Sequence, residues 1–195
     1  VLDYDYLVER LEKSSRDAQP FILVALATAL SHSPTTNDMA MRVLKACGVV
    51  ALKTECREAA FKVMTVIVDK HLTRCDLQVV DQQVQLLLAM MMEGKEANRR
   101  FVELLVLYLE RRFVVEYWTA TGRRMHELVS AYMYSYAIIS FPVDLIRRFM
   151  ALPFERVPCV QEDSPWTALL PPLMPSVFDV DHLTRLIKCH RLSVT

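Results

Sequence analysis

The pattern of apolar and polar positions predicts a chain built almost entirely from helices. Apolar residues recur at helical spacing in several stretches, as at Leu7, Val8 and Leu11, whereas alternation with a period of two is nearly absent. The stretches 21–30, 79–92 and 128–139 are apolar almost all round, so we expect neighbouring helices to cover them on all sides. The expected helices are 4–17, 21–30, 38–46, 55–72, 77–92, 96–113, 114–120, 125–139 and 143–152.

Short connections between these helices favour antiparallel pairing of sequence neighbours. The three glycines, Gly48, Gly94 and Gly122, are expected near helix ends. In hairpin length and burial pattern, residues 1–152 resemble the armadillo/HEAT class of helical solenoids, and the tetrapeptide HLTR occurs twice, at 71–74 and 182–185. The predicted fold is therefore all-α, with stacked antiparallel helical hairpins in an armadillo/HEAT-like solenoid.

The chain becomes rich in proline after residue 152. The segment 153–175 holds six of the nine prolines and cannot form one regular helix, but its apolar residues predict a strap that packs on the helical domain. Ser176 and Asp179 have the spacing of a capping box at the start of a last helix. We therefore expect a helical-repeat domain at 1–152, a Pro-rich strap at 153–175 and a C-terminal helix at 176–195.

Composition favours a subunit of a larger assembly. Hydrophobic residues make up 53% of the chain and the mean hydropathy is +0.20, which is more apolar surface than a monomer of this size easily hides. No stretch reaches the ~20 apolar residues that a membrane span needs. The net charge is zero, and five cysteines without a CxxC motif favour a reducing intracellular compartment, with mitochondrial matrix, cytoplasm and nucleus all open. The first residues predict no signal peptide.

The sequence offers little catalytic chemistry. It contains no phosphate-binding glycine loop and neither the GxSxG nor the HExxH motif. His71 and Cys75 have a spacing that suits a metal on a helix, and Asp179, Asp181 and His182 form a second cluster, but no further ligand pair completes either site. We therefore predict no catalytic residue, no metal site and no cofactor, and keep a metal-dependent enzyme that uses these residues as an alternative.

Arginine gives the one pattern that suggests a binding site. Residues 95–156 carry ten basic side chains, nine of them arginine, and seven acidic ones. Guanidinium groups bind phosphate and nearby aromatic rings can stack on bases, so these residues form a candidate RNA-binding or phosphate-binding ridge. Its members are Arg99, Arg100, Arg111, Arg112, Arg123, Arg124, Arg147, Arg148, Tyr117, Trp118 and Tyr132. The alternative is a solvated face on which arginine pairs with Glu103, Glu110, Glu116 and Glu127.

These observations predict a non-enzymatic scaffold or adaptor. The resemblance to helical-repeat proteins implies a subunit that binds other proteins, and helical-repeat proteins of this kind often serve organellar RNA processing. An adaptor that binds only protein is the alternative to one that also contacts RNA. No small-molecule substrate is evident in the sequence.

Overall fold

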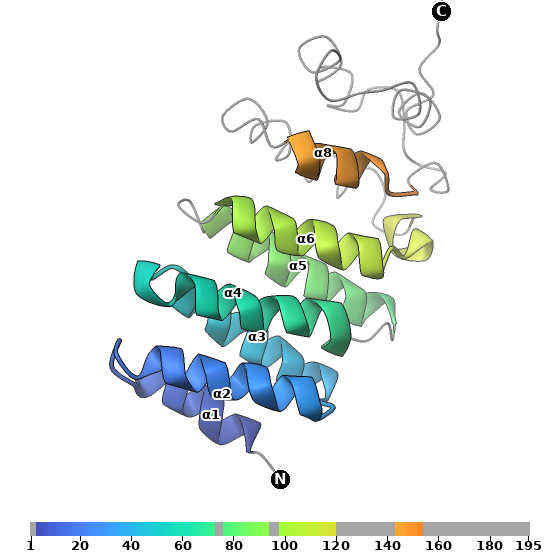
Figure 1. Ribbon diagram of the computed structural model, residues 1–195. Helices are drawn as coiled ribbons and strands as arrows, with labels where there is room; N and C mark the ends of the chain where they lie inside the picture. The colour runs from blue at the N-terminus through green and yellow to red at the C-terminus, as the bar shows by residue number, and fades with distance from the viewer. Residues whose placement is uncertain (1–2, 73–75, 94–97, 120–142, 154–195) are drawn as a thin grey trace, which may run out of the picture. The chain divides into compact units, whose positions relative to one another are not determined.

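A computed structural model describes residues 3–72, 76–93, 98–119 and 143–153 (Figure 1). Of these residues 83% are helical and none lies in a strand, which confirms the all-α prediction for the described part of the chain. The chain divides into two compact units, Val1–Arg111 and Arg112–Thr195, and each is described by itself.

Six α-helices form the described part of the first unit. They are α1 (Tyr4–Lys13), α2 (Gln19–His32), α3 (Asn37–Ala51), α4 (Arg57–Val66), α5 (Leu77–Glu93) and α6 (Asn98–Arg111). A 3₁₀ turn, η1 (Thr54–Cys56), precedes α4, and a π-helical turn, η2 (Ile67–His71), follows it. The described part of the second unit contains α8 (Val143–Met150) and a helical stretch at 115–119.

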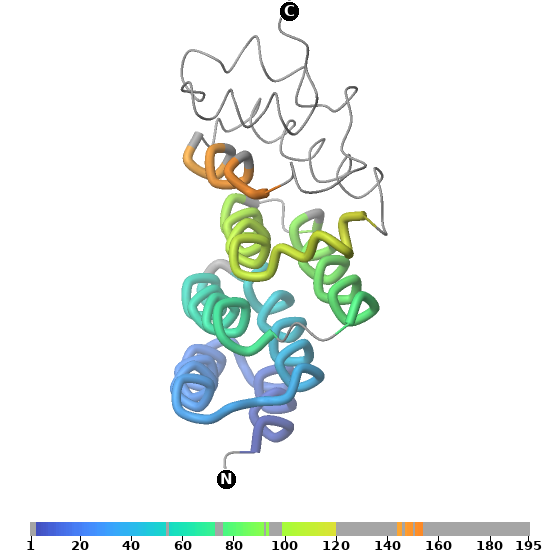
Figure 2. Tube along the Cα trace, turned by 90° about the vertical axis from the view of Figure 1, so that its right-hand side faces the viewer, coloured from blue at the N-terminus to red at the C-terminus, as the bar shows by residue number. Residues whose placement is uncertain are grey.

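The six helices lie in two layers. Figure 2 shows α1, α3 and α5 on one side of the first unit and α2, α4 and α6 on the other. Helix α3 packs against α1 and α5 within its layer, and α4 packs against α2 and α6 within the other layer. Contacts between the layers join α1 to α2, α3 to α4 and α5 to α6. The pairs α1–α2, α3–α4 and α5–α6 therefore join the two layers, and helices that follow one another within a layer also contact each other.

Local sequence explains where several helices begin. The side chain of Asp3 accepts a hydrogen bond from the Tyr6 amide, and that of Asp76 accepts one from the Val79 amide. Thr36 caps α3, because its hydroxyl accepts a hydrogen bond from the Met39 amide at 3.3 Å, and Asn37 is the first residue of the helix.

The apolar run 86–92 lies mainly in the core. Leu87, Leu88 and Met91 of α5 are buried, with 3% or less of each residue exposed. Ala89 is exposed and Leu86 is half-buried, so one edge of the run reaches the surface. The predicted burial of this run between neighbouring helices is therefore correct for most of the described positions.

Some expectations were wrong. The first helix ends at Lys13 rather than at residue 17. Helix α2 is not covered on all sides, because Phe21 and Val24 are 78% and 62% exposed. Gly48 does not end a helix; it lies inside α3, which continues to Ala51 rather than stopping at residue 46. A Cβ atom at Gly48 would meet the end of the Met90 side chain of α5, which would have to move to admit it.

Several predicted elements fall outside the described residues. These are the Pro-rich strap at 153–175 (apart from Pro153), the C-terminal helix at 176–195 and the helix at 125–139. Within the residues that the structure does describe, no helix combines the length and the apolar character that crossing a bilayer requires.

Candidate functional site

The arginines of the predicted ridge that belong to the first unit do not lie together at one edge of it. Arg99 and Arg100 lie in the first turn of α6, whereas Arg111 is its last residue. Eleven or twelve residues of α-helix span roughly 17 Å, so these arginines lie at opposite ends of the helix. An RNA strand bound at one end of α6 would therefore contact only part of the predicted set.

The arginines of α6 are engaged with carboxylates. Arg99 pairs with Glu103 at 3.3 Å, and Arg100 pairs with Glu103 at 3.0 Å and with Glu58 at 3.2 Å. Arg111 pairs with Asp69 at 2.7 Å. The guanidinium of Arg100 also lies over the ring of Phe61, 5.2 Å from its centre. These pairs match the alternative of a solvated, ion-paired face, including its predicted partner Glu103.

The remaining members of the set lie in the second unit or outside the described residues. Tyr117 and Trp118 are each 1% exposed and contact each other edge to face, so a base could stack on either ring only after it became exposed. Arg112, Arg147 and Arg148 each take part in an interaction with another group. Arg123, Arg124 and Tyr132 lie outside the described residues. The RNA role of the whole set stays a prediction.

His71 has a structural partner. Its Nε2 lies 2.7 Å from the carbonyl oxygen of Leu30, which can only accept a hydrogen bond, so Nε2 donates and carries the proton. This nitrogen is then unavailable to a metal in this arrangement. Among the described residues, no cluster of three or more His, Cys, Asp or Glu side chains is arranged to hold a metal ion. Cys75, Asp179, Asp181 and His182 lie outside them.

The described cysteines are not activated. Burial raises the pKa of the Cys47 thiol to about 12 and also raises that of Cys56. The Cys56 thiol donates weakly to Gln19 Oε1 at 3.7 Å. A neutral, buried thiol is a poor nucleophile, so neither residue has the environment of a catalytic cysteine.

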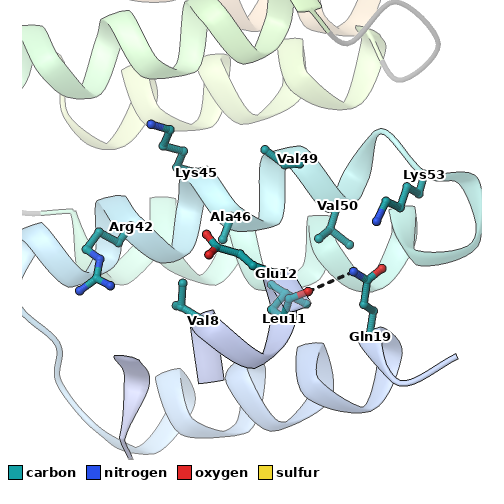
Figure 3. A pocket seen from close by; sticks show the side chains of 10 residues that line it. All are labelled: Val8, Leu11, Glu12, Gln19, Arg42, Lys45, Ala46, Val49, Val50 and Lys53. Atoms are coloured by element: carbon teal, nitrogen blue, oxygen red, sulfur yellow. Dashed lines mark hydrogen bonds between the residues drawn. The ribbon is translucent and has the colours of Figure 1, made fainter. Parts of the chain in front are cut away.

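A surface hollow between α1 and α3 is the best-formed candidate site. We call it the first hollow; its volume is about 460 Å³. Figure 3 shows the side chains that line it. Five are apolar, namely Val8, Leu11, Ala46, Val49 and Val50, and four are charged, namely Glu12, Arg42, Lys45 and Lys53.

Contacts inside the chain join the walls of the first hollow. Gln19 is 1% exposed, and its Nε2 donates to the Leu11 carbonyl at 3.0 Å (Figure 3). Arg42 forms an ion pair with Asp5 of α1, and both side chains are more than half exposed. Exposed ion pairs contribute little to stability, so the buried Gln19 bond is the firmer of the two contacts.

A smaller second hollow, of about 160 Å³, lies between α3 and α5. Its lining includes Leu52, Leu86, Ala89 and Met90, with Lys45 and Glu93 as its charged groups. Lys45 and Val49 line both hollows, so both residues lie on the crest of α3 between them.

Lys53, which lines only the first hollow, follows Lys45 and Val49 at the next position of the same spacing. Lys45, Val49 and Lys53 are spaced four residues apart, which places them on one face of a helix, and we call them the α3 stripe. The Lys53 amide donates to the Val50 carbonyl at 3.0 Å, so the helical turn continues to Lys53 although α3 ends at Ala51. Val49 is 60% exposed, comparable to Val24 of α2 at 62%.

Comparison with protein-family models, with curated proteins and with solved structures found no match to this chain. The function is therefore argued from the site alone. The sequence prediction missed the first hollow because it ended the third helix at residue 46. The signal that it overlooked is the i, i+4, i+8 spacing of Lys45, Val49 and Lys53.

Proposed function

We propose that this chain is a non-enzymatic helical-repeat adaptor that binds a partner protein through the layer formed by α1, α3 and α5. The observation that carries the proposal is the pair of hollows on either side of the α3 stripe. Exposed apolar surface with a charged rim is typical of protein-binding sites, and Val49 adds an exposed apolar side chain at its centre.

The spacing of side-chain partners supports the repeat character. Bonds between helices of one layer join residues that are 37 apart for Arg42 and Asp5, and 46 apart for Gln83 and Asn37. In the other layer, the separation is 41 for His71 and the Leu30 carbonyl, and 42 for both Arg100–Glu58 and Arg111–Asp69. These values lie around the ~40–47-residue period of armadillo and HEAT repeats. We therefore infer stacked helical hairpins, each placed about one repeat after the last.

Co-purification with matched variants tests the adaptor function. The tagged chain is expressed in cells of its native host, the extract is treated with nuclease, and bound proteins are identified by mass spectrometry. We expect a defined set of partners that survives nuclease treatment and is lost with Val49→Asp. Val24→Asp is the control, because Val24 is equally exposed (62%) but belongs to α2 in the other layer. Loss of the partners on nuclease treatment, or an identical set with Val49→Asp, would overturn the proposal.

A further inference from the structure

We draw no further inference here: the strongest candidate, the apolar surface formed by the two hollows on either side of α3, carries nothing, because its lining mixes lysines with glutamates and nothing in the structure shows what covers it.

Discussion

Buried polar side chains connect three helices of the first unit at one point. The Tyr108 hydroxyl of α6 donates to Gln83 Oε1 at 2.6 Å, and Gln83 Nε2 donates to Asn37 Oδ1 at 2.7 Å. Gln83 and Tyr108 are fully buried, so water cannot replace the bond between them, whereas the bond to Asn37 is partly buried. Together the two bonds join α5 to α6 and to the start of α3.

Tyr108→Phe removes the hydroxyl and leaves Gln83 Oε1 without this donor. We expect the free energy of unfolding to fall by about 1 kcal/mol or more, the usual net contribution of a buried hydrogen bond, as measured by urea denaturation. Tyr6→Phe is the control: its hydroxyl accepts from Arg10 Nε at 3.0 Å on the surface, and its loss should change stability by no more than about 0.5 kcal/mol. Equal effects in the two variants would contradict the role of the buried bond.

We expect Cys47 not to react with thiol reagents in the folded protein. Its sulfur is buried and its pKa is raised to about 12, so at pH 8 only a very small fraction is thiolate. We expect iodoacetamide to leave the peptide that contains Cys47 unmodified in native protein and to alkylate it fully in about 6 M guanidinium. Mass spectrometry of the digested protein gives both values. Rapid native labelling at pH 8 would show that α3 opens far more readily than its packing implies.

The structure of α2 illustrates what apolar periodicity can and cannot reveal about an element. The sequence correctly predicts a helix near 21–30, and the observed helix is longer at both ends, Gln19–His32. Because almost every position is apolar, the pattern gives no preferred face, and the exposure of Phe21 and Val24 was not foreseen. Only the packing of α1 and α4 decides which side is buried.

Neighbouring positions of α2 should therefore respond differently to truncation. Leu26 is fully buried, so Leu26→Ala should lower the free energy of unfolding by about 2–5 kcal/mol through lost burial and a cavity. Val24→Ala, at a position that is 62% exposed, should change it by no more than about 0.5 kcal/mol. Urea denaturation measures both. A large cost at Val24 would mean that the exposed side of α2 is covered by another part of the molecule.

Gly48 shows why the predicted helix ends were less accurate than the helices themselves. Glycine costs a helix interior about 1 kcal/mol relative to alanine, so its position suggested an end. In the structure this local preference is overridden, because α3 continues through Gly48, which is buried, to Ala51. The early end at residue 46 separated Lys45 from Val49 and Lys53, and so concealed the stripe on which the proposed function rests.

At the scale of the whole molecule, the helical class followed from periodicity but the site did not. The first hollow combines α1, α3 and Gln19 of α2. No local pattern within one helix encodes a surface that three helices share. The sequence offered pairing of these arginines with nearby carboxylates such as Glu103 as an alternative, and Arg100 does pair with Glu103. The second partner of Arg100, Glu58, and the partner of Arg111, Asp69, lie 42 residues away in the sequence, so helical spacing could not predict them.

A measurement of RNA binding distinguishes the two kinds of adaptor that the sequence allows, one that binds only protein and one that also contacts RNA. Arginines already paired with Glu58, Glu103 and Asp69 would have to exchange these partners for phosphate, which lowers the gain from binding RNA. We therefore expect the purified chain to bind single-stranded RNA only at the non-specific level, with a Kd of about 10⁻⁴–10⁻⁶ M at 150 mM salt, by fluorescence anisotropy.

Variants at both ends of α6 make this expectation decisive. Two variants are compared with the unchanged protein: the double variant Arg99→Gln with Arg100→Gln, and the single variant Arg111→Gln. The Kd for RNA should change by no more than about twofold in either, because these arginines already form ion pairs with carboxylates. The nuclease-resistant protein partners should also be retained, since none of the three arginines lines either hollow. A submicromolar Kd that weakens steeply with salt and is lost with these glutamine variants would instead place RNA on α6. The chain would then be an adaptor with a nucleic-acid surface in addition to its hollows.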